Sequence, residues 1–235
     1  MEKGITKINT VFTFLIYGAA ALLFYFAMYY ALPNMNQIIG GHVSLGYYVS
    51  AGLVFVLLFF SALYGVKREG YTSKEIFKRL RIKTLDTTDW LWTITGIMII
   101  SILTGLIFYL QKTFINDFTS SPPFFKMSTL FPGQRWTLLM WLAVFFFNIV
   151  GEEILWRGFI LPGQELRFKQ KAWILNSLGW CLFHISFGIN MILMLLPILI
   201  LLPYIVQKRG NTTIGIIMHA VLNGPAFVMI ALGII

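Results

Sequence analysis

The stretch that decides the fold is Asn148-Ile-Val-Gly-Glu152-Glu153-Ile-Leu-Trp-Arg157-Gly158, which lies near the end of an apolar run beginning at Trp136. Glu152, Glu153 and Arg157 put three charges inside this run, whereas the other Asp, Glu, Lys and Arg residues lie outside or at the ends of the apolar segments. A charge at the centre of a bilayer costs about 2.5–3.5 kcal/mol on insertion scales. Partner groups must therefore offset the cost of these three charges.

The composition indicates a polytopic membrane protein. Apolar residues make up 58% of the 235 residues and charged residues only 11%, with a mean hydropathy of +0.78. The net charge of +9 comes from basic residues in short loops between apolar runs, which indicates topology and lipid contact rather than nucleic-acid binding. The single cysteine, Cys181, excludes an intramolecular disulfide and a Cys-based zinc cluster.

The apolar runs predict an all-α transmembrane helix bundle of about seven spans. Most runs reach the length of about 20 residues that a spanning helix needs. The fifth and sixth are shorter and are separated only by Gly188-Ile189-Asn190, so they form either a tight hairpin or a re-entrant segment, and Pro197 and Pro203 are expected to kink the second limb. The seven runs are 11–32, 45–66, 90–110, 136–161, 172–187, 191–206 and 213–235.

The distribution of basic residues predicts the orientation. With seven spans, fifteen of the eighteen Lys and Arg residues fall on one side. The positive-inside rule then places the N-terminus in the cytoplasm and the C-terminus outside a cell membrane. We expect one membrane domain, in which residues 1–135 supply the first three helices and a basic cytoplasmic loop, and residues 136–235 supply a core of four helices.

Two loops carry further features. Thr72-Ser73-Lys74-Glu75 has the pattern of a capping box, and Ile76, Phe77 and Leu80 form an apolar stripe flanked by Lys78, Arg79, Arg81 and Lys83. This pattern predicts a short helix near 72–84 on the inner leaflet, and the alternative is a solvated basic loop. The loop 111–135, with Ser120-Ser121-Pro122-Pro123, is either a simple connection or the lining of an entrance.

Polar residues on three spans are expected to lie in one layer of the membrane. At the usual helical rise, Glu152, His184, His219 and Asn223 fall roughly 10–18 Å from the expected cytoplasmic ends of their spans. Glu153 and Arg157 are four residues apart and form an ion pair on one helix face, whereas Glu152 points about 100° away and is the freer carboxylate. A carboxylate and a histidine that activate water, facing two donors for an oxyanion, suffice for peptide hydrolysis.

These residues form three motifs that resemble those of a known family. Glu152 to Arg157 reads Glu-Glu-x-x-x-Arg, Trp180 to His184 reads aromatic-x-x-x-His, and His219 to Asn223 reads His-x-x-x-Asn. In this order they resemble the motifs of the CAAX protease and bacteriocin-processing family, also called the Abi family, of intramembrane glutamic endopeptidases. The resemblance covers residues 136–235, and one departure is Trp180, where the family motif usually has Phe.

The resemblance implies a role for each motif residue. Glu152 and His184 would activate the attacking water, His219 and Asn223 would stabilise the oxyanion, and Glu153 with Arg157 would be a structural pair that supports the site. It implies catalysis without a metal or another cofactor. The expected partners are the lipid bilayer and a peptide or lipidated-peptide substrate. The resemblance implies a prenylated CAAX-type tail or a bacteriocin- or pheromone-type precursor as that substrate, or a role of the protein in self-immunity.

Other functions remain open from the sequence. The protein could be a non-catalytic membrane partner or immunity protein that binds a sensor kinase or a toxin, with His219 and Asn223 serving as interhelical hydrogen-bonding groups. A small ion-coupled carrier is disfavoured because the sequence has no inverted repeat. Glu152 and the two histidines could also hold a zinc ion, although the sequence lacks a His-Glu-x-x-His helix. Cys181 has no evident activating neighbour that would make it a nucleophile.

Overall fold

A computed structural model describes residues 4–40, 42–126 and 128–234 as an all-helical bundle. Six helices in these residues are long and apolar enough to cross a membrane. The first is α1 (Thr10–Phe26), which continues through a π-helical turn, η1 (Ala27–Ala31), into α2 (Leu32–Ile39). The fourth begins as α6 (Thr137–Glu153) and continues through η4 (Ile154–Ile160), α7 (Leu161–Phe168), η5 (Lys169–Lys171) and α8 (Ala172–Phe183) to η6 (His184–Phe187). The other four are single helices: α3 (Val43–Arg68), α5 (Thr87–Phe114), α9 (Ile189–Arg209) and α10 (Thr212–Leu232).

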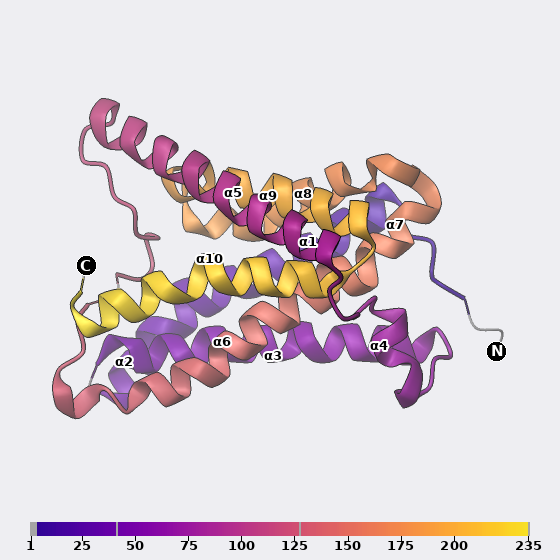
Figure 1. The fold of residues 1–235 in the computed structure, drawn as a ribbon. Coiled ribbons are helices and arrows are strands. Elements are labelled where there is room, and N and C mark those ends of the chain that lie inside the picture. The colour runs from indigo at the N-terminus through magenta and orange to yellow at the C-terminus, as the bar shows by residue number, and fades with distance from the viewer. Residues whose placement is uncertain (1–3, 41, 127, 235) are drawn as a thin grey trace.

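The fourth of these helices consists of two limbs. It turns back at Lys169, whose φ of +49° interrupts the helical path between α7 and α8. Counting the two limbs separately gives seven passes, and the start of α1 and the end of α10 lie at opposite ends of the bundle, as an odd number of passes requires (Figure 1). The prediction of an all-α bundle with about seven spans is therefore confirmed.

The helices that carry the polar motifs form the centre of the bundle. α10 runs between two pairs of helices, contacting α5 and α9 on one side and α6 on the other, while α3 packs along α6 (Figure 1). α8 packs between α1 and α9. Large apolar side chains remain exposed on the outer helices, for example Leu15, Leu53 and Ile102. Such an outer surface suits a lipid solvent, in which exposed apolar groups carry no cost.

The fifth and sixth runs form a tight hairpin. α8 ends at Phe183, the 3-10 turn η6 follows, and Gly188 with a φ of +80° leads into α9. Since α8 has only 12 residues, it spans about 18 Å at the usual rise and its end lies within the length of its neighbours. Pro197 and Pro203 are both contained in the continuous helix α9.

The segment after the two glutamates departs from α-helical geometry. η4 is a π-helical stretch, and Pro162 in the following turn has no N–H to donate to the carbonyl of Gly158. Arg79 fills this role, since its Nη1 donates to the Gly158 oxygen at 2.9 Å and its Nη2 to the Phe159 oxygen at 3.3 Å. Glu69 neutralises Arg79 through a buried ion pair of 2.5 Å. The loop between α3 and α5 therefore braces the helix that carries the first motif.

The predicted surface helix near 72–84 is only partly present. Thr72 and Glu75 form the expected capping box, but the α-helix α4 covers only Ile76–Arg79 after the 3-10 turn η2 (Ser73–Glu75). Leu80 is 1% exposed and Arg79 is 4% exposed. The expectation that Leu80 faces the lipid beside a basic flank containing Arg79 is therefore wrong, because both side chains pack against the core.

Candidate active site

Glu152 lies at the end of α6 and its carboxylate is held on both oxygens. The side chain is buried, and Asn148, one turn earlier on the same helix, donates its Nδ2 to Oε1 at 2.8 Å. The indole Nε1 of Trp180 donates to Oε2 at 2.7 Å, and that of Trp156 approaches the same oxygen at 3.4 Å. Three donors from α6, η4 and α8 thus offset the cost of burying this carboxylate.

Glu153 forms the ion pair that the spacing predicted. Its Oε1 lies 3.2 Å from Nη1 of Arg157, and both side chains are fully buried. The guanidinium also stacks on the ring of Trp180, with its Cζ 3.5 Å from the ring centroid. Gly215 on α10 makes room for this pair, because a Cβ there would lie 2.5 Å from Oε2 of Glu153.

His184 follows the last residue of α8, where the helix tightens into the 3-10 turn. Its Nδ1 lies 2.9 Å from the backbone oxygen of Trp180. A carbonyl oxygen only accepts, so Nδ1 carries the proton and donates it, which leaves Nε2 of the neutral ring as a proton acceptor.

His219 and Asn223 lie one turn apart on α10. Nδ1 of His219 lies 2.9 Å from Oε1 of Glu153, so the carboxylate fixes the orientation of this imidazole and leaves Nε2 for other partners. His219 is buried, whereas Asn223 is exposed toward the opening of a cavity.

One cavity collects the predicted catalytic side chains. It has a volume of about 440 Å³, and Glu152, His184, His219 and Asn223 all line it. The remaining wall is mostly aromatic and aliphatic and comes from α1, α3, α5, α6, α8, η6, α9 and α10; it includes Phe24, Tyr47, Phe55, Trp141, Phe145, Phe183, Phe187, Met191, Leu195 and Phe227. Glu153 and Arg157 lie behind this wall. A carboxylate and two imidazoles thus face a largely apolar space that a peptide with apolar side chains can fill.

The loop between α5 and α6 packs against the aromatic wall of this cavity. Phe124 packs edge-on against Phe187 at 5.3 Å and against Phe24 at 5.8 Å, and Phe125 stacks on Tyr47 at 4.3 Å. Because the three contacted rings line the cavity, the Pro122–Phe125 segment is part of the outer shell of the site rather than a simple connection.

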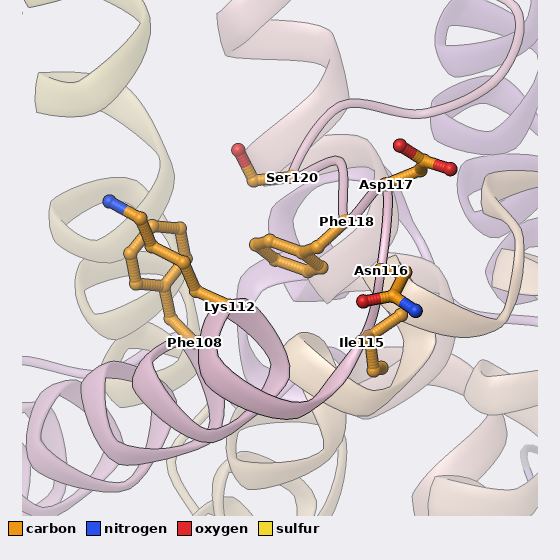
Figure 2. Close-up of a pocket in the computed structure, with 7 residues that line it drawn as sticks. All are labelled: Phe108, Lys112, Ile115, Asn116, Asp117, Phe118 and Ser120. Atoms are coloured by element: carbon orange, nitrogen blue, oxygen red, sulfur yellow. The ribbon is translucent and has the colours of Figure 1, made fainter.

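A second hollow lies at the far end of α5 and holds none of the motif residues. It has a volume of about 480 Å³ and is lined by Phe108, Lys112, Ile115, Asn116, Asp117, Phe118 and Ser120 (Figure 2). All of these residues except Phe118 are exposed, and the charged groups of Lys112 and Asp117 point to opposite sides in this view. The hollow therefore offers no converging set of reactive groups.

Sequence reasoning missed several partners of the motif residues. Asn148 lies four residues before Glu152, so helical spacing alone could have identified it. The Trp180 indole and the second partner of Glu153, His219, come from other helices, and spacing within one helix carries no signal for them. Cys181 is half-buried and does not line the cavity. Among the described residues, no group of three or more His, Cys, Asp or Glu is arranged to hold a metal ion.

These features define a multi-pass membrane protein with a buried polar cluster at the end of α6. Residues 134–224, which contain all three motifs, match the model of the family described as type II CAAX prenyl endopeptidase Rce1-like. This match supports the CAAX protease family that the motifs indicated, a family of CAAX-type intramembrane proteases. No curated protein and no solved structure matches the chain.

Proposed function

We propose that this protein is an intramembrane endopeptidase in which Glu152 and His184 activate a water molecule for attack on a peptide bond. The observation that carries the proposal is that Glu152, His184, His219 and Asn223 line one cavity, while the Glu153–Arg157 pair supports them from behind. Glu152, His184 and His219 are each held by a neighbouring group, as a catalytic constellation requires.

The reaction follows from the donors and acceptors around the cavity. Oxygen of the water bonds to the substrate carbonyl carbon as a water proton passes to the Glu152 carboxylate, assisted by Nε2 of His184. The resulting oxyanion accepts hydrogen bonds from the Asn223 amide and from Nε2 of His219. His219 must be protonated for this task, because Nδ1 already donates to Glu153. When the C–N bond breaks, Glu152 returns the proton to the leaving amine.

The proposed substrate is a membrane-associated peptide, either a prenylated CAAX-type tail or a bacteriocin- or pheromone-type precursor. The family description and the aromatic lining of the cavity support an apolar substrate. We further propose a multi-pass protein of the cell membrane with a cytoplasmic N-terminus, since most basic residues lie on that side under the positive-inside rule.

Cleavage by purified protein in liposomes tests this function. A farnesylated peptide with a CAAX end, the same peptide without the lipid, and a leader-type precursor peptide are incubated with wild type, Glu152→Ala and His184→Ala at matched folded amounts. Mass spectrometry identifies the bond that is cut, and each reaction is repeated with a chelator.

We expect chelator-resistant cleavage of at least one peptide that both substitutions abolish. Chelator-sensitive cleavage would replace direct carboxylate catalysis with a metal-assisted reaction. If no peptide is cut and Glu152→Ala also retains full activity in cells, the protein is a binding partner and not a peptidase.

A further inference from the structure

Trp180 contacts groups from all three motifs. Its indole N–H donates to Glu152 at 2.7 Å, its ring face carries the Arg157 guanidinium at 3.5 Å, and its backbone oxygen accepts from His184 at 2.9 Å. The same ring meets the rings of His184 and His219 edge-on, with centroids 5.5 and 5.4 Å apart. Trp180 is 1% exposed, so these contacts fix the indole in one orientation.

The indole N–H of Trp180 donates to one oxygen of Glu152, and the side-chain amide of Asn148 donates to the other. An indole N–H and an amide NH₂ can only donate. The two donors therefore fix the rotation of the carboxylate plane. Trp156 also points its N–H at Oε2, but at 3.4 Å this contact is much weaker.

We propose that Trp180 is a positioning residue that holds the Glu152 carboxylate in its reactive orientation through the indole N–H. This inference rests on the proposed function, in which Glu152 is the base. The apolar bulk of Trp180 is a separate contribution, since a phenyl ring could also stack on Arg157. The two contributions are separable because Trp180→Phe removes the N–H and retains an aromatic ring.

Trp156→Phe is the matched control for this substitution. Trp156 is as buried as Trp180, it also stacks on an aromatic ring, Tyr17 at 4.2 Å, and it points at the same carboxylate oxygen. Both variants lose the same volume from the core, so their packing losses are comparable. The two variants differ in the indole hydrogen bond to Glu152 that is lost, which is 2.7 Å long for Trp180 and 3.4 Å long for Trp156.

The first readout is turnover of the peptide substrate in liposomes. Trp180→Phe is expected to lower kcat by about tenfold or more, the loss of one hydrogen bond to a charged group, with KM changed less than about twofold. Trp156→Phe is expected to lower kcat by less than about threefold at a similar loss of thermal stability. Equal losses of kcat in the two variants would overturn the inference.

The second readout does not need a substrate. In ¹H–¹⁵N spectra of the protein in detergent, the indole resonance that disappears in Trp180→Phe is assigned to Trp180. Glu152→Gln should move this proton resonance upfield, and by more than the resonance of Trp156. An unmoved Trp180 resonance would show that no such hydrogen bond exists.

The failure of the inference differs from that of the proposed function. If Glu152→Ala abolishes cleavage and Trp180→Phe retains the wild-type kcat, only the positioning role is wrong. If Glu152→Ala retains cleavage, the base has been assigned to the wrong residue and the role of Trp180 falls with it.

Discussion

Nδ1 of His219 lies 2.9 Å from the same Glu153 oxygen that faces Arg157 at 3.2 Å. One buried carboxylate therefore serves two partners on different helices. From the sequence, Glu153 is a structural partner of Arg157 alone. In the folded protein it also orients the imidazole that we propose as an oxyanion donor, so its stabilising and functional contributions are coupled.

Glu153→Gln is expected to destabilise the protein strongly. The substitution leaves the Arg157 guanidinium buried without a counter-charge, and breaking a buried ion pair on one side costs about 3–5 kcal/mol. We expect a lower yield of folded protein and a lower thermal midpoint in detergent. Normal yield and an unchanged midpoint would show that the pair is not needed for folding.

Replacing both partners separates stability from function. A double variant, Glu153→Leu with Arg157→Met, removes both buried charges, and such replacements are often neutral or stabilising. We expect its thermal midpoint to recover relative to Glu153→Gln while turnover stays low, because His219 no longer has its acceptor. Wild-type turnover in the double variant would rule out an orienting role for Glu153.

Gly215→Ala tests the close approach of α10 to the ion pair. The added Cβ would lie 2.5 Å from Oε2 of Glu153 and 3.1 Å from Val206, so helix or carboxylate must move. We expect a stability loss of about 1–3 kcal/mol, typical of overpacking, together with reduced turnover. Gly105→Ala is the control, since its Cβ meets nothing within 4 Å and Ala is the better helix former; a similar stability loss in both variants would show that the contact with Glu153 is not its cause.

Arg79→Met tests the brace on the π-helical segment. The substitution leaves Glu69 buried and unpaired and removes the donors to the Gly158 and Phe159 carbonyls, so we expect a loss of about 3–5 kcal/mol in unfolding free energy. Lys78→Met, at the neighbouring exposed position, should change stability by less than about 0.5 kcal/mol. Chemical denaturation in detergent compares the two, and equal stability would mean that the brace is dispensable.

Asn223→Ala is expected to lower turnover without a loss of folded protein. The side chain is exposed toward the cavity opening, so its removal leaves no buried partner unsatisfied. Loss of one oxyanion donor typically lowers kcat by about 10²–10³-fold. A fall in KM and kcat together with a lower thermal midpoint would indicate a structural role instead.

The sequence predicted the features that depend on local spacing. Apolar runs identified the spans, the i,i+4 rule paired Glu153 with Arg157, and depth along each helix brought Glu152, His184, His219 and Asn223 to one cavity. These predictions work because helical rise and rotation are fixed by the backbone.

The contacts that the sequence did not predict join distant segments. Trp180 reaches Glu152 across 28 positions of the chain, and His219 reaches Glu153 across 66. Arg79 belongs to a loop whose composition is that of an exposed basic surface, yet it is buried against a helix 79 residues away. Such pairings depend on how the helices pack, and periodicity within one helix carries no information about them.

The most direct measurement of the central claim compares turnover of the farnesylated CAAX peptide by wild type, Glu152→Ala and Glu165→Ala in liposomes at equal folded amounts. Glu165 lies on α7 and pairs with Arg81, away from the cavity. Its substitution therefore controls for the loss of a glutamate. If Glu152 activates the water, Glu152→Ala should be inactive while Glu165→Ala keeps its activity. Cleavage by Glu152→Ala at the rate of Glu165→Ala would contradict the assignment of Glu152 as the catalytic base.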